Sequence, residues 1–340
     1  MAQKITTFPT AATPGKFREV IVDTPQLEPH EVLIKMLACG ICHTDHNFLG
    51  AGEGLILGHE PVGRVVALGS EVSRLKVGDI VGTSYLFKAC LDCSECNSGN
   101  DNMCEKRVMF PGEGNLKFNG FADHQIADSR FAAKIPASME PKYAGPLMCA
   151  GITVFNAIYM SNVRPTGRIG VVGIGGLGHL ALQFARAWGC HVTAISGSPD
   201  KKEEALSFGA HDFLVSKNLK AGDLKAEDKF DLILDTVSAS LDWDLYISLL
   251  KRNGGLYLMG FPDKPMEIKN APGFITGQTS LRGAINGGRY LTELMLDFAD
   301  RHNIKPMVEE YPYNVQGIEE GMKVCGEGKA RYRGVLVAKE

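Results

Sequence analysis

The chain has 340 residues, and its 36 basic and 39 acidic side chains give a net charge of −3 at pH 7. This length exceeds what one hydrophobic core usually holds, so we expect two domains. No basic run is longer than two or three residues, which argues against a nucleic-acid partner, and no apolar stretch approaches membrane-spanning length. Residues 1–21 lack the apolar core of a signal peptide, so we expect a cytoplasmic protein whose nine cysteines are reduced.

The first third of the sequence is typical of short β-strands separated by turns. Residues 31–38 and 63–68 are rich in branched apolar side chains, and residues 80–82 follow a Gly-Asp turn. We therefore expect an irregular, β-rich domain that carries metal ligands on its loops.

One group of potential metal ligands is scattered along the chain. Cys42, the pair His59-Glu60 and Cys149 are far apart in sequence, and each stands beside glycine or other small residues. Two cysteines and one histidine would leave a zinc ion one ligand short. A catalytic zinc needs such an open position for water or a substrate oxygen, so this group favours a catalytic site.

A second group of potential ligands is compact and follows C-x2-C-x2-C-x7-C spacing within residues 88–107. Four thiolates this close together complete a tetrahedral shell, which predicts a structural zinc ion rather than disulfides. These ligands are Cys90, Cys93, Cys96 and Cys104. The other three cysteines have no partner at metal spacing, and we expect them to be small buried apolar side chains. They are Cys39, Cys190 and Cys325.

The pattern changes after about residue 146. A short buried strand at residues 167–172 runs into the turn Gly173-Ile-Gly-Gly-Leu-Gly178 and then into an amphipathic helix that ends at Gly189. The apolar face of this helix is formed by Leu177, Leu180, Ala181, Phe184, Ala185 and Trp188. Further strands are predicted at residues 191–195, 231–234 and 255–259, with a helix at residues 200–208. This alternation predicts βαβ units and a parallel, doubly wound Rossmann sheet.

The predicted domains are not continuous in sequence. We expect an α/β protein with a zinc-binding catalytic domain at residues 1–149, which includes the zinc lobe at residues 88–107, and a Rossmann domain at residues 150–287. Residues 288–340 are predicted to return to the catalytic domain, with a helix at residues 290–301 and a strand at residues 333–338.

The glycine turn matches the G-x-G-x-x-G pattern of dinucleotide-binding proteins. Gly173 permits a tight turn, Gly175 lets the backbone approach a pyrophosphate, and Gly178 allows the helix to pack closely on the strand. The helix N-terminus would then face the phosphate charge. Because the turn follows a strand and opens a helix, its context favours a dinucleotide site over a merely glycine-rich turn.

The end of the second strand should indicate which dinucleotide binds. An NAD enzyme places an Asp or Glu there for the ribose hydroxyls, whereas this chain has Ser196 and Gly197. Ser196 and Ser198 can donate hydrogen bonds to a 2′-phosphate, and Lys201 can supply positive charge, which favours NADP(H). In the alternative interpretation, Asp200 caps the next helix and the lysines are solvated; the two interpretations are compatible.

These features together resemble the zinc-dependent medium-chain alcohol dehydrogenases, and more narrowly their cinnamyl-alcohol-dehydrogenase-like, NADP-dependent branch. The resemblance covers essentially the whole chain and implies a GroES-like catalytic domain with a Rossmann domain. It is carried by the four-cysteine lobe and by Cys39-Gly-Ile-Cys-His-Thr-Asp45, Gly58-His-Glu60, Leu147-Met-Cys-Ala-Gly-Ile-Thr153, Gly173-Ile-Gly-Gly-Leu-Gly178 and Ser196-Gly-Ser198.

The resemblance also implies roles for residues near the open zinc site. Cys42, His59 and Cys149 would be the zinc ligands, and Glu60 would approach the metal when its fourth ligand exchanges. Asp45 would orient His59. Thr44 would bond the substrate oxygen and start a proton relay. The zinc would act as a Lewis acid on a carbonyl while hydride moves to or from the nicotinamide.

The outer end of the relay departs from the family pattern. Many relatives have a histidine five residues after the first zinc cysteine, where this chain has Asn47, and His46 stands one place earlier. Asparagine cannot take up a proton at neutral pH, so either His46 reaches the relay or water completes it. Alternatively, His46 is an exposed loop residue without a catalytic role. We expect His43 at the phosphates of the cofactor.

We expect the cofactor contacts to come from the glycine turn, the strand end and two threonines. The predicted set is Gly173, Gly175, Gly176, Leu177, Gly178, Ser196, Gly197, Ser198, Lys201, Thr153 and Thr236. The expected substrate pocket is apolar, which suits an aromatic or aliphatic aldehyde, although any of its members could instead belong to the core. These members are Phe48, Leu49, Leu86, Met109, Phe110 and Ile285.

The sequence thus predicts an NADP(H)-linked aldehyde reductase with two zinc ions per chain, a small-molecule substrate and a homo-oligomeric state, either dimer or tetramer. One alternative is an NAD-linked or polyol-directed zinc dehydrogenase. Another is a dinucleotide-binding zinc protein without catalysis. A zinc ribbon that binds nucleic acid is disfavoured because the four-cysteine lobe is acidic; its acidic residues include Asp92, Glu95, Asp101 and Glu105.

Overall fold

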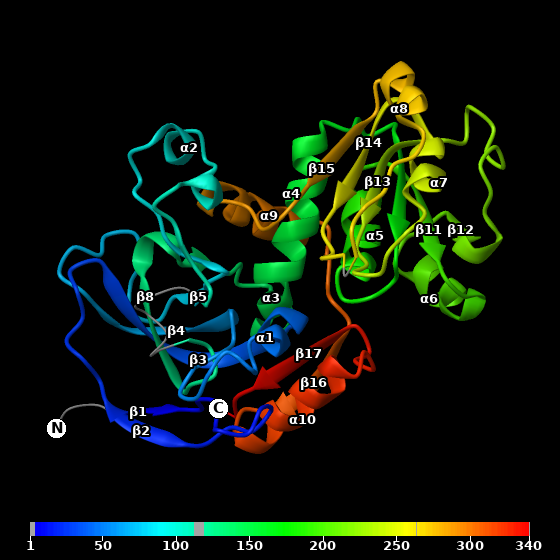
Figure 1. Ribbon diagram of the computed structural model, residues 1–340. Helices are drawn as coiled ribbons and strands as arrows, with labels where there is room; N and C mark the ends of the chain where they lie inside the picture. The colour runs from blue at the N-terminus through cyan, green and yellow to red at the C-terminus, as the bar shows by residue number, and fades with distance from the viewer. Residues whose placement is uncertain (1–3, 112–118, 263, 340) are drawn as a thin grey trace. The chain divides into compact units, whose positions relative to one another are not determined.

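The computed structural model describes residues 4–111, 119–262 and 264–339, and the chain divides into two compact units. The first unit contains Met1–Ile152 and Gly287–Glu340, and the second contains Thr153–Asn286. In Figure 1 the C-terminal strands and helix α10 lie with the N-terminal strands, which shows that both ends of the chain build the first unit.

A mixed sheet in the order β16-β17-β3-β4-β5-β9, with β8 paired to β3, is the centre of the first unit. Its strands are β3 (Glu31–Ile41), β4 (Glu60–Leu68), β5 (Ile80–Gly82), β8 (His124–Asp128), β9 (Ala133–Lys134), β16 (Val308–Pro312) and β17 (Arg333–Val337). Two smaller sheets pair β1 (Lys4–Thr7) with β2 (Val20–Asp23) and β6 (Leu86–Lys88) with β7 (Val108–Met109). The helical segments of this unit are α1 (His43–Asn47), α2 (Ser94–Asn97), η1 (Asp101–Met103), η3 (Ser129–Phe131), α3 (Pro141–Pro146), the π-helical η4 (Leu147–Gly151), α9 (Arg289–Arg301) and α10 (Val315–Gly326).

Strand β3 is the element that places the site. Its apolar residues Val32, Ile34 and Met36 are buried, and it pairs antiparallel with β4, β8 and β17. The register sets Gly40 opposite Glu60 at the end of the β3–β4 pair. The segment that follows β3 and the segment that precedes β4 therefore leave the sheet at the same place.

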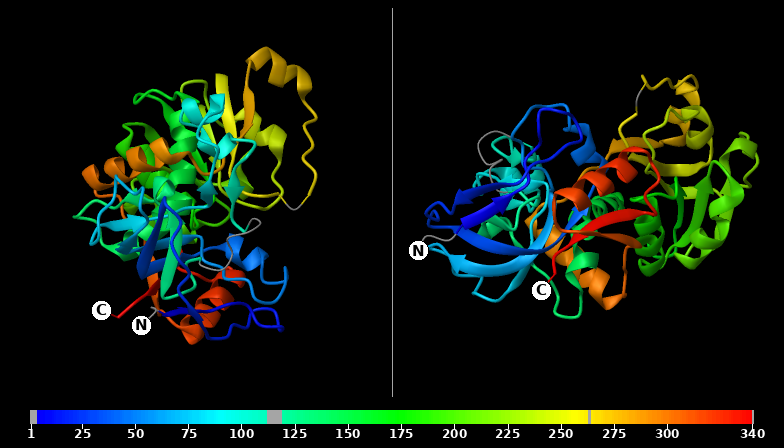
Figure 2. Two further views of the ribbon diagram at one scale, coloured as in Figure 1. Left: turned by 90° about the vertical axis from the view of Figure 1, so that its left-hand side faces the viewer. Right: turned by 90° about the horizontal axis from the view of Figure 1, so that it is seen from below.

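The second unit is a six-stranded sheet in the order β12-β11-β10-β13-β14-β15, in which every pair is parallel. Its strands lie side by side as one layer (Figures 1 and 2). They are β10 (Arg168–Val172), β11 (His191–Ser196), β12 (Asp212–Val215), β13 (Phe230–Asp235), β14 (Leu250–Leu258) and β15 (Ser280–Gly283). The accompanying helices are α4 (Ile152–Ser161), α5 (Gly178–Ala187), η5 (Pro199–Lys201), α6 (Lys202–Ser207), η6 (Ser216–Asn218), α7 (Trp243–Ser248) and α8 (Ala271–Gly277).

The core of the second unit follows the predicted periodicity. Leu180, Phe184 and Ala185 of α5 are fully buried, whereas Leu177 and Trp188, at the ends of the predicted apolar face, are half-buried. The helix predicted at residues 200–208 is shorter than expected, because its first turn is the 3₁₀ segment η5.

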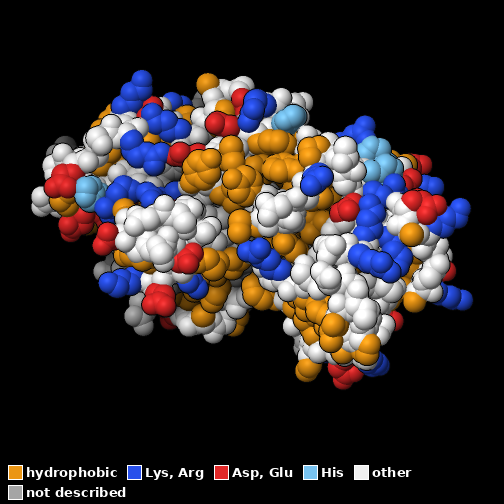
Figure 3. Space-filling view, turned by 90° about the horizontal axis from the view of Figure 1, so that it is seen from above, with side chains coloured by type: hydrophobic (Ala, Val, Ile, Leu, Met, Phe, Trp, Pro, Cys, Tyr) orange, Lys and Arg blue, Asp and Glu red, His pale blue; other side chains and the backbone are white. Residues whose placement is uncertain are grey.

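The expectation that no apolar stretch approaches membrane-spanning length is wrong. Pro141–Ser161 forms a 21-residue helical stretch that has the length and mean hydropathy, 1.3, of a membrane span. Of its apolar window 72% is buried inside the protein, which is typical of a core helix. The face in Figure 3 carries basic and acidic side chains interspersed with one another.

Candidate active site and metal centres

The scattered ligands are brought together in the first unit. Cys42 follows β3 at the start of α1, His59 and Glu60 stand at the start of β4, and Cys149 lies in η4. The ligand atoms of these four residues all lie within 4.8 Å of one another. His59 and Glu60 are completely buried and Cys42 nearly so.

His59 is held with one ring nitrogen facing the cysteines. Its Nδ1 lies 3.0 Å from Asp45 Oδ1, and Asp45 also accepts hydrogen bonds from the backbone nitrogens of Gly58 (2.9 Å) and Cys42 (3.2 Å). Among the residues that the structure describes, the buried Nε2 has no hydrogen-bond partner, and Glu60 Oε1 lies 3.8 Å away. Buried polar atoms are nearly always paired, so a bare imidazole nitrogen beside two thiols fits a zinc ligand whose other nitrogen is fixed by a carboxylate.

Glu60 is paired with an arginine that the sequence analysis missed. Arg333, the first residue of β17, is 5% exposed; it donates from Nη2 to Glu60 Oε1, and its Nη1 lies 4.0 Å from Cys42 Sγ. Burial raises the pKa of Glu60 to about 7, against the lowering effect of the Arg333 charge. A Cβ atom on Gly40 would lie 1.8 Å from Glu60 Oε2, so only glycine leaves room for this carboxylate. In the sequence, Arg333 could have been recognised as a functional candidate because it is a single arginine at the start of an otherwise apolar terminal strand.

The proposed relay residues lie on helix α1. Thr44 and His46 are half-buried, Asn47 is exposed, and the ring of His46 stacks on that of His43 at 5.3 Å. The other side of His46 meets α10, where a Cβ atom on Gly326 would lie 2.3 Å from His46 Nε2. Burial and the His43 charge lower the pKa of His46. His46 is therefore half-buried on a helix rather than exposed on a loop, and its part in the relay stays a prediction.

The expected pocket residues separate into several environments. The rings of Phe48 and Phe110 meet edge to face at 5.5 Å, and the Phe110 ring lies 4.9 Å from that of His59. Phe110 and Leu86 are each 2% exposed and belong to the core, whereas Phe48, Leu49 and Met109 are half-buried. Ile285 belongs to the second unit, where its carbonyl accepts a hydrogen bond from Asn156 Nδ2 (2.7 Å).

The four cysteines of the lobe also converge, with their sulfur atoms within 4.8 Å of one another. Cys104 Sγ lies 3.5 Å from Cys90 Sγ, which is 3.9 Å from Cys96 Sγ. Hydrogen bonds from the backbone nitrogens of Asp92 and Cys93 lower the pKa of Cys90 to about 6. Burial raises the pKa of Cys96 to about 12 instead. The convergence of the four sulfur atoms, rather than these pKa shifts, fits a structural metal site.

Of the cysteines without a metal partner, Cys39 and Cys190 are buried as expected, whereas Cys325 is only half-buried. Cys325 lies in α10 and packs at the edge of a hydrophobic cluster in the first unit. Its partial exposure corrects the expectation that all three are core residues.

In the second unit, each glycine of the turn has a different constraint. Gly173 has a φ of +86°, and a Cβ atom there would lie 2.3 Å from Val237 Cγ1. A Cβ atom on Gly178 would lie 1.8 Å from the Gly173 carbonyl oxygen, whereas one on Gly175 would have no described heavy atom within 4 Å apart from its chain neighbours. Gly176 and Leu177 complete the turn, and α5 begins at Gly178 without a side-chain cap. The space at Gly175 fits a ligand that approaches the backbone, as a pyrophosphate does.

The strand-end residues lie beside this turn. Ser196 ends β11, and Lys201 Nζ donates to the carbonyl of Ile174, within the turn, at 2.8 Å. Asp200 accepts a hydrogen bond from Ser198 Oγ (3.0 Å), and the N-cap of α6 is Lys201. Asp200 therefore does not cap α6, which corrects that part of the alternative interpretation. Lys201 and Lys202 are both exposed, as that interpretation expects, although Lys201 also contacts the turn.

The second unit also contains the two predicted threonines, Thr153 and Thr236, and a buried acid that was not predicted, Asp235. Thr236 Oγ1 donates to the carbonyl of Val172 (2.8 Å) and lies 3.1 Å from that of Gly173, and Thr153 is buried in α4. Asp235 ends β13 in full burial, and its Oδ1 accepts a hydrogen bond from Val237 N (3.1 Å). Its Oδ2 has no hydrogen-bond partner in the described part of the chain. Burial raises the pKa of Asp235 to about 6.

Comparisons with known proteins agree with this geometry. Residues 28–137 match the family model of the alcohol dehydrogenase GroES-like domain, and residues 176–301 match that of the zinc-binding dehydrogenases. An aldehyde reductase from Synechocystis is 39% identical over 95% of both chains. A mannitol dehydrogenase from Petroselinum crispum is 39% identical over 90% of this chain and 93% of its own.

Solved structures of similar proteins indicate the same family. A cinnamyl alcohol dehydrogenase from Sorghum bicolor superposes with a TM-score of 0.89 at 33% identity and covers 98% of both chains. One from Helicobacter pylori, determined in complex with NADP(H), has a TM-score of 0.88 at 27% identity over 99% of both chains. The predicted fold class, a GroES-like domain with a Rossmann domain, is confirmed. The chain belongs to the zinc-type medium-chain alcohol dehydrogenases, within their cinnamyl-alcohol-dehydrogenase-like branch.

Proposed function

We propose that this oxidoreductase is a zinc-dependent, NADP(H)-linked alcohol dehydrogenase that works mainly as an aldehyde reductase. The observation that carries the proposal is the convergence of Cys42, Cys149 and the bare, buried Nε2 of His59. Three neutral or anionic ligands of this kind bind zinc and leave one coordination position open.

The residues of the site have distinct proposed roles. Cys42, His59 and Cys149 hold the zinc, which when bound polarises a carbonyl as a Lewis acid. Asp45 keeps the proton on Nδ1 of His59, so that Nε2 remains a ligand. Arg333 holds the Glu60 carboxylate beside this set.

Proton movement is assigned to α1. Thr44 donates a hydrogen bond to the substrate oxygen and passes on its proton. His46 or a water molecule carries the proton onward, because Asn47 cannot. The proposed catalytic domain is residues 1–149 with 288–340, and the proposed NADP-binding domain is residues 150–287.

Metal content tests the two proposed zinc sites. We expect two zinc ions per chain. Cys42→Ser or Cys149→Ser should each remove one zinc and abolish turnover in a protein that stays folded and still binds cofactor. Cys104→Ser should instead lower the Tm, because structural zinc binding contributes directly to folding. A Cys104→Ser protein with both metals and unchanged Tm would contradict the assignment.

NADP(H) is supported by the absence of an acid at position 196 and by the Lys201 ammonium at the glycine turn. A relative that was solved with NADP(H) is consistent with this choice. We expect kcat/KM to be at least about tenfold higher with NADPH than with NADH, a difference of about 1.4 kcal/mol. Ser196→Asp should reverse this preference, because its carboxylate would repel a 2′-phosphate. Equal use of both cofactors by the wild type would contradict the proposal.

Aldehydes with an aromatic or medium aliphatic body are the proposed substrates. The support is the apolar character of the half-buried Phe48, Leu49 and Met109. The Phe48 ring contacts that of Phe110, which lies 4.9 Å from the ring of His59. NADPH consumption with benzaldehyde, cinnamaldehyde, hexanal and a sugar would compare the classes directly. A polyol-directed reaction is the second candidate, because a similar protein is named mannitol dehydrogenase. A preference for the sugar would favour this second candidate.

We also propose a cytoplasmic homo-oligomer, either dimer or tetramer. The support is that β15 ends the strand order of the six-stranded sheet while Phe261 and Ile275, in the same unit, are 74% and 70% exposed. Strand edges and exposed apolar side chains are common at interfaces between copies of a chain. Light scattering after size-exclusion chromatography would measure the mass, and a monomer at micromolar concentration would contradict this proposal.

A further inference from the structure

A buried carboxylate ties the four-cysteine lobe to helix α9. Asp101 is 1% exposed, and its carbonyl accepts a hydrogen bond from the backbone nitrogen of Cys104 (3.1 Å). Its carboxylate accepts three hydrogen bonds from Arg289, from the backbone nitrogen and Nε at 3.0 Å and from Nη2 at 3.1 Å. An arginine fork on a carboxylate fixes direction as well as distance. Arg289, the first residue of α9, is therefore held by Asp101, whose backbone carbonyl is hydrogen-bonded to the lobe residue Cys104.

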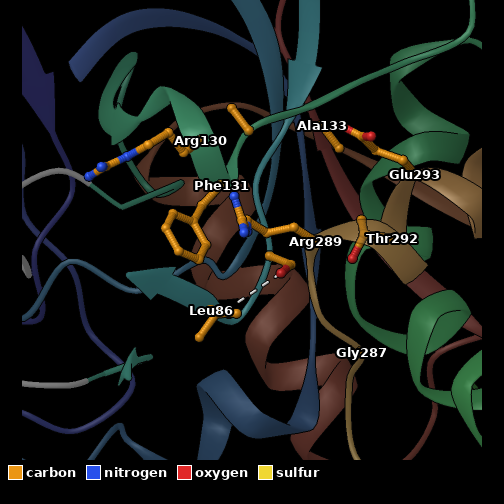
Figure 4. A pocket seen from close by; sticks show the side chains of 10 residues that line it. Leu86, Arg130, Phe131, Ala133, Gly287, Arg289, Thr292 and Glu293 are labelled. Atoms are coloured by element: carbon orange, nitrogen blue, oxygen red, sulfur yellow. Dashed lines mark hydrogen bonds between the residues drawn. The ribbon is translucent and has the colours of Figure 1, made fainter. Parts of the chain in front are cut away.

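The packing around this pair leaves little room for adjustment. A Cβ atom on Gly288 would lie 2.4 Å from the carbonyl oxygen of Gly99, so the backbone of α9 touches that of the lobe. The Arg289 guanidinium lies 5.3 Å from the centre of the Phe131 ring, and Figure 4 shows the two side chains next to each other. The cavity that they line has a volume of about 10 Å³, which is room for about one water molecule.

The same helix supports the segment that carries Cys149. Leu291, Met295 and Leu296 of α9 are buried, and α9 packs against η4. A Cβ atom on Gly287 would lie 2.9 Å from the Cδ1 atom of Ile152, which directly follows η4. The residues on either side of Cys149 in η4 are completely buried. The position of Cys149 therefore depends on the packing of η4 rather than on a strand.

We propose that Arg289 is a positioning residue that links the four-cysteine lobe to metal retention at the Cys42, His59 and Cys149 site. The inference rests on the proposed function, because it takes both sites to be zinc sites. Without the Asp101–Arg289 pair, α9 loses its anchor at the lobe, and η4 loses a fixed support. A ligand that is less well positioned holds its metal less tightly.

Zinc release measures this link without using activity. Arg289→Met keeps the aliphatic stem but removes the side-chain donors, and Arg301→Met makes the same change at the exposed end of α9 as a matched control. Each protein is loaded with zinc, and release into a chromogenic chelator is followed over time. We expect one of the two zinc ions to leave Arg289→Met about tenfold faster than it leaves the wild type or Arg301→Met.

A second background identifies which zinc is affected. The Cys149→Ser protein should keep only the four-cysteine zinc, and adding Arg289→Met should leave the release of that zinc unchanged. If Arg289→Met accelerates release in this background, the pair serves only the lobe and the proposal is wrong. Equal release from Arg289→Met and the wild type would also overturn it.

A third variant guards against a folding defect. Arg289→Met leaves the buried Asp101 charge without its partner, whereas Asp101→Asn with Arg289→Met removes both charges. The double variant should release one zinc as fast as Arg289→Met does, and release at the wild-type rate would overturn the proposal. A wild-type protein that starts with fewer than two zinc ions would instead contradict the proposed function.

Discussion

The glycine turn gives a prediction in which two alanine substitutions three residues apart have opposite effects. At Gly178 a Cβ atom would lie 1.8 Å from the Gly173 carbonyl oxygen and 2.9 Å from its carbon. Backbone atoms cannot move aside without shifting β10 relative to α5. Gly178→Ala should therefore destabilise the fold by about 1–3 kcal/mol, as overpacking does.

At Gly175 the added methyl group would meet no heavy atom of the described residues within 4 Å apart from its chain neighbours, and its φ is not in the left-handed region. Gly175→Ala should keep or slightly raise stability, by about 0.4–1 kcal/mol, because alanine restricts the unfolded chain. The methyl group would, however, occupy the space that we assign to the pyrophosphate. We expect NADPH binding to weaken about tenfold or more, since that contact cannot form at its normal distance.

Thermal unfolding of the two apo variants and titration of NADPH by fluorescence would separate these effects. Gly175→Ala should show a wild-type Tm with weak binding, and Gly178→Ala should show a lowered Tm. If Gly175→Ala binds NADPH as tightly as the wild type, the phosphates do not lie at this turn. If Gly178→Ala keeps the wild-type Tm, the contact distance does not limit the fold.

Three further substitutions test buried polar groups. Arg333→Met should lower the free energy of unfolding by about 3–5 kcal/mol, because Glu60 stays buried without its partner. Adding Glu60→Gln should recover part of the lost Tm. If the Tm does not recover, the pairing is contradicted. Gly40→Ala should displace the Glu60 carboxylate, so we expect a lowered Tm that Glu60→Ala restores. The pKa of Asp235 is about 6 in the folded protein, compared with an ordinary value of 3.8. Protonated Asp235 therefore stabilises the fold below pH 4. This stabilisation, about 3 kcal/mol, is lost as the pH rises through 6. The Tm of Asp235→Asn relative to wild type should therefore rise by about 5 °C or more from pH 4 to pH 7.5, and a constant difference would refute the burial argument.

Local patterns determined much of this protein. The spacing of Cys90, Cys93, Cys96 and Cys104 predicts their convergence, because a short loop can close around one ion. The strand, glycine turn and helix around Gly173 form one local unit, and hydrophobic periodicity identified most of its buried face. For polar groups that pair across the sheet, such as Arg333 and Glu60, the local sequence does not indicate which residue is the partner.

Tertiary structure alone decided which distant residues meet. Arg333 reaches Glu60 because β17 pairs with β3, and the register of β3 with β4 brings Gly40 opposite that carboxylate. Asp101 meets Arg289 because the chain returns to the first unit at Gly287 after completing the second. Lys201 lies at the glycine turn because β11 pairs with β10 in parallel. The Arg333–Glu60 and Lys201 contacts depend on strand order and register, whereas the Asp101–Arg289 contact depends on the return of the chain to the first unit. All three are set by the packing of the whole chain rather than by the residues near each partner.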